Sequence, residues 1–213
     1  MALNSPTDLV TLTEHLLRTQ GTRRRLVAIA GAPGSGKSTF AQALARTLNA
    51  ASPGMAAVLG MDGFHLDDGV LIARGHHARK GAPHTFDVAG LDALLGRLCA
   101  DDGSDVAIPV FDRELEIARA GAAILESSVR LVVVEGNYLL LDAPDWRALQ
   151  RHFDLTIRLD VPHDVLVDRL TRRWQGYGLD PDEVRTKLEG NDLPNARLVG
   201  EHSVDCDVTV LNS

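Results

Sequence analysis

A glycine-rich turn constrains the fold of this 213-residue chain more than any other feature. Residues 26–30 (L-V-A-I-A) are apolar throughout, and the next eight, Gly31–Ser38, read G-A-P-G-S-G-K-S. This run matches G-x-x-x-x-G-K-[S/T] at every fixed position. A buried strand that enters a helix through such a turn brings backbone N–H groups and the positive end of the helix dipole together on a phosphate. We therefore expect a strand over residues 26–30, a phosphate-binding turn, and a helix over about residues 37–48.

The turn also predicts which residues contact a nucleotide. Lys37 places a cation on the outer phosphates, and the Ser38 hydroxyl can ligate Mg²⁺. The predicted nucleotide-binding residues are Gly31, Ala32, Pro33, Gly34, Ser35, Gly36, Lys37, Ser38 and Thr39. A chance match is the alternative, but a strand before the turn and a helix after it are the context that phosphate binding requires. The turn occurs in kinases, GTPases, motor ATPases and DNA-handling enzymes. The chain has neither the N-K-x-D run of a small GTPase nor the L-S-G-G-Q-like signature of a transport ATPase.

Short apolar runs alternate with amphipathic segments along the rest of the chain. This order predicts an α/β fold with a mostly parallel sheet, helices on both faces, and a single domain over residues 1–213. The expected strands are 26–30, 56–61, 106–111, 130–135, 155–159 and 208–211. The expected helices are one within residues 1–22, then 37–48, 88–100, 163–174 and one that begins at 181. Ser5 is the expected N-cap of the first helix, with Pro6 at its first position. Residues 63–86 are polar and glycine-rich, which indicates a long loop.

Composition limits the class of protein and its partners. Apolar residues make up 45% of the chain, too many for a disordered protein, and the net charge of −7 argues against coating nucleic acid or an anionic membrane. We expect Cys99 and Cys206 to be reduced and mostly buried thiols, and the arginine run 23–25 to be a solvated strand entry. The sequence shows neither a membrane span nor a signal peptide, so we expect a cytoplasmic protein. A homodimer is one of the oligomeric states that the sequence allows.

Two carboxylates follow predicted strands. Asp62 comes after the second apolar run, and Glu135 ends the run V-V-V-E, each with a glycine next to it. In open α/β sheets, ligands bind at the carboxyl ends of the strands. Glu135 therefore fits a residue that positions Mg²⁺, and Asp62 fits a general base for an acceptor hydroxyl. The alternative for each carboxylate is a helix cap or a surface charge.

Three arginines share a predicted helix after Pro162. Arg169 lies three or four positions from Arg172 and Arg173, so they occupy one side of the helix. A glycine-bearing loop follows. This pattern favours a short lid over residues 163–190 that closes on the transferring phosphates. The alternative is an exposed helix whose arginines pair with Asp164 and Asp168.

The order of these motifs resembles the P-loop kinases that include uridine kinase, bacterial-type pantothenate kinase and phosphoribulokinase. The resemblance covers about residues 25–210. It rests on Gly31–Ser38, 61–65 (M-D-G-F-H), 79–87 (R-K-G-A-P-H-T-F-D), 108–112 (I-P-V-F-D), 134–136 (V-E-G) and the arginines from Arg169. The chain is most similar to small bacterial proteins called fructose transport system kinases, through residues 114–121 and 191–195. The resemblance implies the P-loop NTPase fold, with ATP and Mg²⁺ as cofactors.

The resemblance also implies roles for individual residues. Asp62 would be the base, Lys37, Arg169 and Arg173 would contact the phosphates during transfer, and Ser38 and Glu135 would hold Mg²⁺. The residues expected in the acceptor pocket are His65, His84, Phe111, Arg113, Glu116 and Arg119. Uridine kinases have a tyrosine at the position of Phe111, a histidine near Glu116 and a longer lid, and these differences argue against uridine. The adenine pocket is expected only loosely, around residues 191–195.

Together these features predict an ATP-dependent phosphotransferase that phosphorylates a hydroxyl group of a small metabolite. A sugar such as fructose is the first choice, and a nucleoside or a pantothenate-like alcohol is the second. A non-catalytic ATP-binding regulator is the alternative of another class, although it would have no use for a base at Asp62. A nucleic-acid-handling ATPase would need a long basic track with stacking aromatics, which nine aromatic residues and a charge of −7 do not favour. The expected partner is therefore a small-molecule acceptor, not nucleic acid or a membrane.

Overall fold

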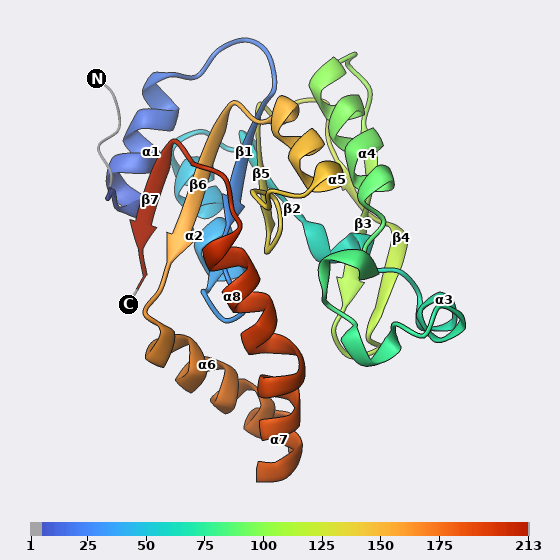
Figure 1. Ribbon diagram of the computed structural model, residues 1–213. Helices are drawn as coiled ribbons and strands as arrows, with labels where there is room; N and C mark the ends of the chain where they lie inside the picture. Colours follow the sequence, from blue (N-terminus) through green and yellow to red (C-terminus); the bar gives the residue numbers. More distant parts are fainter. Residues whose placement is uncertain (1–5, 213) are drawn as a thin grey trace.

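A five-stranded parallel sheet forms the centre of the protein, shown in Figure 1 as a computed structural model that describes residues 6–212. The strands lie in the order β2-β5-β1-β6-β7, and each neighbouring pair is parallel. Their bounds are β1 Arg25–Ala30, β2 Ala56–Gly60, β5 Leu131–Gly136, β6 Leu155–Asp160 and β7 Val208–Leu211. Five of the six predicted strands are therefore confirmed in this sheet, together with the predicted α/β class.

Helices cover both faces because alternate residues of each central strand point to opposite sides. In β1, Val27 and Ile29 pack with α1 (Leu9–Arg18) and α2 (Lys37–Ala51). Leu26 and Ala28 pack on the other face. That face is covered by α4 (Val88–Ala100), α5 (Pro144–Arg147), the 3-10 turn η4 (Ala148–His152) and α8 (Leu193–Glu201). Strands that are buried on both faces explain the uninterrupted apolar runs.

The register of the sheet brings the predicted functional segments to one edge. Glu135 is paired with both Gly60 of β2 and Ile29 of β1. The phosphate-binding turn follows β1, and Asp62 lies in the 3-10 turn η1 (Met61–Phe64) that follows β2. All three segments therefore meet at the carboxyl end of the sheet, as a parallel arrangement requires.

A two-stranded antiparallel hairpin lies apart from the main sheet (Figure 1). The predicted strand 106–111 is β3 (Val106–Asp112) of this hairpin, and its partner β4 (Ile117–Leu125) was not predicted. β4 is mostly exposed and rich in alanine, so it has no apolar run to mark it. The expected loop 63–86 also contains short helical elements: α3 (Asp68–Ala73), η2 (His77–Arg79) and η3 (Pro83–Thr85).

The C-terminal helices extend beyond the carboxyl ends of the strands (Figure 1). α6 (His163–Gly176) is followed by α7 (Pro181–Lys187), which Asp180 begins with a capping box that includes Glu183. The backbone then passes through a π-helix, η5 (Leu188–Asp192), directly into α8. Such π segments interrupt the regular hydrogen-bond ladder and often lie at functional sites.

Some local expectations were wrong. Asp8 caps α1 through the Thr11 N–H, 2.7 Å away, whereas the expected cap Ser5 lies outside the described residues. Arg24 is not solvated: it is 2% exposed and donates to the carbonyl of Val129 at 3.0 Å. Cys99 and Cys206 are free thiols, but Cys99 is exposed and Cys206 only half-buried. Among the described helices, none is long and apolar enough to cross a bilayer.

Candidate active site

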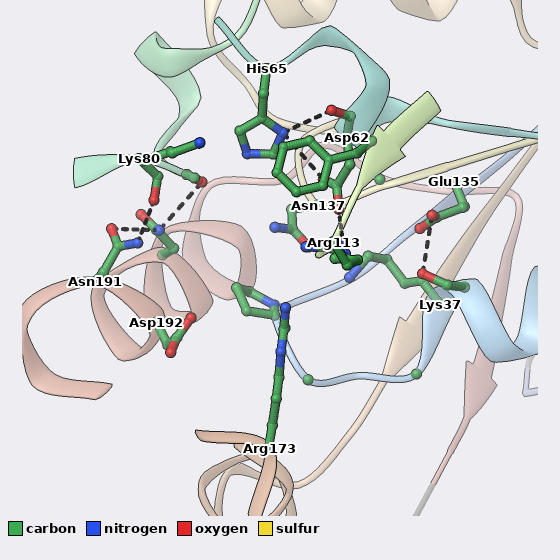
Figure 2. A pocket seen from close by; sticks show the side chains of 18 of the residues that line it. Lys37, Asp62, His65, Lys80, Arg113, Glu135, Asn137, Arg173, Asn191 and Asp192 are labelled. Atoms are coloured by element: carbon green, nitrogen blue, oxygen red, sulfur yellow. Dashed lines mark hydrogen bonds and ion pairs between the residues drawn. The ribbon is translucent and has the colours of Figure 1, made fainter. Parts of the chain in front are cut away.

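A cavity of about 420 Å³ opens at the carboxyl edge of the sheet, between the phosphate-binding turn, the hairpin and the C-terminal helices (Figure 2). Most of the residues predicted from the sequence line it: Pro33, Gly34, Gly36, Lys37, Ser38, Thr39, Asp62, His65, Phe111, Arg113, Glu116, Glu135, Arg169 and Arg173. Segments that are distant in the sequence thus contribute to one site.

The turn before α2 has the backbone that an anion site needs. Gly34 and Gly36 have φ angles of +78° and +85°, which side chains other than glycine rarely adopt. Gly36 is the N-cap of the 15-residue α2 and provides no side-chain cap. The first N–H groups of this helix are therefore free for a phosphate. Asn212, which follows β7, donates to the carbonyl of Ser35 at 2.7 Å and holds the turn in place.

Lys37 is almost completely buried beneath this turn. Its Nζ donates to the carbonyl of Ala32 at 2.9 Å. Burial lowers the pKa of Lys37, while the negative charges of Glu135 and Asp62 oppose that shift. The ammonium group is held by backbone oxygen rather than by a carboxylate in direct contact. A nucleotide phosphate would give the ammonium group an anion in direct contact.

Ser38 and Glu135 form the predicted metal pair. The Ser38 hydroxyl donates to Oε1 of Glu135 at 3.1 Å. Burial raises the pKa of Glu135, and the charge of Lys37 counteracts this. A hydroxyl and a carboxylate are hard oxygen donors, which fit Mg²⁺. Residues 6–212 contain no cluster of three or more metal-ligating His, Cys, Asp or Glu side chains, so phosphate oxygens and water would complete the coordination of Mg²⁺.

Asp62 faces the cavity from the opposite side. One of its carboxylate oxygens forms an ion pair with Arg113 of the hairpin, and the other lies 3.9 Å from Nδ1 of His65. His65 Nδ1 is also 2.9 Å from the backbone oxygen of Asp62. Burial lowers the pKa of His65, which keeps the ring neutral near pH 7 and leaves Asp62 with one close cationic partner, Arg113.

Aromatic rings form the wall behind Asp62. The ring of His65 lies 4.1 Å from that of Phe86 and 4.8 Å from that of Phe111, between centroids. Phe111 in turn has the guanidinium of Arg113 at 5.0 Å and the ammonium of Lys80 at 5.6 Å from its centroid. This end of the cavity therefore combines a carboxylate, two cations and an apolar surface.

The arginines of α6 border the phosphate side. Arg169 Nη1 is 3.5 Å from the carbonyl of Ser35, and Arg173 extends from α6 into the cavity (Figure 2). The guanidinium of Arg173 lies over the ring of Trp174, 5.4 Å from its centroid. Trp174 donates to Asp192 of η5 at 2.6 Å, which links α6 to the π-helix. Arg172, by contrast, pairs with Asp168 at 3.0 Å, as the surface alternative expects.

Two of the expected acceptor residues do not line this cavity. His84 packs edge-on against His76, with the ring centroids 4.6 Å apart. Arg119 forms an ion pair with Asp112 at 3.0 Å on the hairpin. Asp112 also accepts hydrogen bonds from the N–H groups of Glu114 and Leu115, so this pair shapes the turn that presents Arg113.

Lys80 was not among the expected site residues, and Asn191 was expected only as part of an adenine pocket around residues 191–195. Lys80 Nζ donates to Asp68 Oδ1 and to the carbonyl of Glu116, both at 2.6 Å. Asn191 of η5 donates to the carbonyl of Lys80 at 2.7 Å (Figure 2). Arg79 donates to the carbonyl of Gly190. Segments 79–87 and 191–195 therefore contact each other. This contact can be seen only in the folded structure, because the two segments are far apart in the sequence.

Known proteins resemble this chain in both sequence and structure. Residues 26–197 match the model of the "Phosphoribulokinase / Uridine kinase family". The chain is 34% identical over 193 residues to "Uncharacterized protein YggC" of Escherichia coli K12, which covers 88% of this chain and 78% of that protein. It is 30% identical over 195 residues to "Putative uridine kinase C227.14" of Schizosaccharomyces pombe, with 88% and 83% covered.

A solved structure is more similar still. The crystal structure of a "putative fructose transport system kinase" from Silicibacter sp. TM1040 is 44% identical, with a TM-score of 0.88. The match covers 95% of this chain and 98% of that one. The family match and this structural likeness both support the α/β fold of P-loop kinases.

Proposed function

The chain belongs to the phosphoribulokinase/uridine kinase family, and on this premise we propose that it transfers the γ-phosphoryl group of ATP to a hydroxyl group of a small metabolite. One observation carries the proposal. Asp62 and the phosphate-binding turn border the same cavity, with the Ser38–Glu135 pair at the phosphate side. A protein that only binds nucleotide needs the turn, but it has no use for a carboxylate at the opposite side.

The position of each residue in the cavity determines the role that we propose for it. Asp62 accepts the proton of the acceptor hydroxyl while the hydroxyl oxygen bonds to the γ-phosphorus and the bond from that phosphorus to ADP breaks. Lys37, Arg169 and Arg173 lie where negative charge would build up on the transferring group, and they stabilise it. Ser38 and Glu135 would hold Mg²⁺, which supplies charge neutralisation on the phosphate oxygens when it is bound.

The C-terminal segment 163–190 would act as the lid. Arg169 and Arg173 of α6 reach the cavity, and the Trp174–Asp192 hydrogen bond couples α6 to η5. Closure of such a segment excludes water, so the phosphoryl group passes to the acceptor rather than to solvent. We place this chemistry in the cytoplasm, where ATP is available and the free thiols Cys99 and Cys206 stay reduced.

A sugar is the first choice of acceptor. The support is the likeness to a protein whose name refers to fructose, together with the absence of uridine-kinase features at Phe111 and Glu116. A nucleoside or a pantothenate-like alcohol is the second choice within the same reaction. In either case the acceptor hydroxyl would lie beside Asp62, against the ring of Phe111.

A screen of ADP release tests the proposal. Purified protein with ATP and Mg²⁺ is offered sugars, sugar derivatives, nucleosides and pantothenate, and ATP binding is measured in parallel. We expect at least one acceptor to raise ADP release well above the rate with ATP alone. Tight ATP binding with no stimulation by any acceptor would instead favour a nucleotide-binding regulator.

A further inference from the structure

Two cations converge on the acceptor end of the cavity, one on each side of the site where a hydroxyl would meet Asp62. We propose that the acceptor carries an anionic group, a carboxylate or a phosphate, which Arg113 and Lys80 bind. This inference rests on the proposed function and deepens it, because it names the class of acceptor: a hydroxy acid or a sugar phosphate rather than a neutral sugar.

The first observation is the arrangement around Phe111. The guanidinium of Arg113 and the ammonium of Lys80 both lie within 6 Å of this ring. Both residues line the cavity, and each cation already has one carboxylate partner, Asp62 for Arg113 and Asp68 for Lys80. An anion with two or three oxygens can accept hydrogen bonds from both cations at once, and charge-assisted hydrogen bonds of this kind are among the strongest in proteins.

The second observation concerns the contacts that the Asp62 carboxylate makes. One carboxylate oxygen is paired with Arg113, and the other faces His65 Nδ1 at 3.9 Å. The 3.9 Å separation is too long for a hydrogen bond, so Arg113 occupies one oxygen of the proposed base while the other only faces the His65 ring. An anionic group on the acceptor competes for Arg113 and draws the guanidinium away from Asp62. The same binding event then holds the acceptor and frees the carboxylate that must take its proton.

The surroundings permit this exchange. Arg113 lies on the turn of the β3–β4 hairpin, and its side chain is 47% exposed, so the guanidinium has room to reorient. Lys80 is fixed instead: Nζ donates to Asp68 and to the carbonyl of Glu116, a residue whose positive φ of +56° turns the chain there. An ammonium group has three N–H donors, so one remains for a ligand.

The charge of the cavity agrees with an anionic acceptor. Its lining includes six cationic side chains and four carboxylates, whereas the whole chain has a charge of −7. Lys37, Arg169 and Arg173 lie on the phosphate side, where ATP would use them. Arg113 and Lys80 lie beside Phe111 on the acceptor side, in a lining that also includes the carboxylates of Asp62 and Glu116. A neutral sugar would leave Arg113 paired with Asp62.

The test compares acceptors that differ only in charge. The protein is first loaded with Mg²⁺ and a non-hydrolysable ATP analogue, so that phosphate probes cannot occupy the nucleotide site. D-gluconate is titrated against D-sorbitol, and fructose 6-phosphate against fructose, by calorimetry. We expect at least one charged member to bind about tenfold or more tightly than its neutral partner. The two pairs separate a carboxylate from a phosphate preference.

Variants assign the preference to Arg113. Arg113→Gln removes the charge and should abolish the difference between charged and neutral probes, while Arg113→Lys should keep most of it. Arg147→Gln, which removes an exposed arginine paired with Asp142 elsewhere on the surface, is the matched control and should behave as wild type. Thermal unfolding establishes that each variant is folded.

Equal affinity for charged and neutral probes, or no binding of either, would overturn the inference, as would a preference that survives in Arg113→Gln. This outcome differs from failure of the proposed function. If neutral sugars stimulate ADP release and Arg113→Gln has no effect, the kinase proposal stands and the anionic acceptor is wrong. If anionic probes bind through Arg113 but no acceptor stimulates ADP release, the anion site stands and phosphoryl transfer is wrong.

Discussion

Replacing Asp62 by Asn separates the proposed chemistry from binding. Asn keeps the size of the side chain but cannot accept the proton of the acceptor hydroxyl. General base catalysis contributes about 10²–10⁴ in rate, which corresponds to a barrier increase of about 3–5 kcal/mol. We therefore expect the kcat of Asp62→Asn to fall by that factor at saturating ATP and acceptor.

The structure predicts a much smaller effect on folding. The substitution removes the charge of an ion pair whose members are 26% and 47% exposed, and such pairs contribute about 1 kcal/mol or less. For a chain of this length, that lowers the melting temperature by about 4 °C or less. ATP affinity should change less than about twofold, because neither the phosphate-binding turn nor Lys37 is altered.

Three measurements make the prediction refutable. Initial rates give kcat, titration with ATP gives its affinity, and thermal unfolding gives stability. Asp168→Asn is the matched control, since it removes the carboxylate of an exposed ion pair with Arg172 and should leave all three unchanged. If Asp62→Asn keeps more than about one-tenth of the wild-type kcat, a loss short of the range for a general base, the proton acceptor lies elsewhere and the assignment of Asp62 is wrong.

Other consequences concern Glu135, Arg24 and Trp174. Burial raises the pKa of Glu135, so its ionisation opposes folding as the pH rises above the ordinary value of 4.5. In melting curves recorded without nucleotide, the stability of Glu135→Gln relative to wild type should increase as the pH rises from 4.5 toward neutrality. A stability difference that does not change with pH would contradict this. Arg24→Met should lower stability by about 3 kcal/mol in denaturant titrations, since it removes a buried guanidinium that donates to four backbone carbonyls; a loss within 0.5 kcal/mol, the usual range for a surface substitution, would contradict its buried role. Mg²⁺ and ATP should change the emission of Trp174 at the lid, and the change should vanish in Trp174→Phe, which retains the buried Trp146; a change that persists would place the movement elsewhere.

The central sheet and the phosphate side of the site could be predicted because local pattern determines them. An apolar run buried on both faces marks β5, and the glycine spacing of the turn fixes the backbone around Lys37. Parallel strands also place their carboxyl ends together, so the sequence alone assigns Asp62 and Glu135 to one edge of the sheet.

The acceptor side could not be predicted to the same extent, because it is built by contacts between distant segments. β4 is an exposed strand without alternation, so only the β3 half of the hairpin that carries Arg113 has a local signal. Lys80 reaches the site only because η5 and the hairpin hold its segment. Arg24 was misassigned for a related reason: a run of charges predicts solvent, but here backbone carbonyls surround the guanidinium.

The most direct test follows the γ-phosphoryl group itself. Protein, Mg²⁺ and γ-³²P-labelled ATP are incubated with the acceptor that the screen identifies, and the label is separated into ATP, inorganic phosphate and phosphorylated acceptor. We predict that the label enters the acceptor in a one-to-one ratio with ADP, and that Asp62→Asn suppresses this transfer. Label that stays in ATP, or that appears only as inorganic phosphate at a rate independent of the acceptor, would contradict the account.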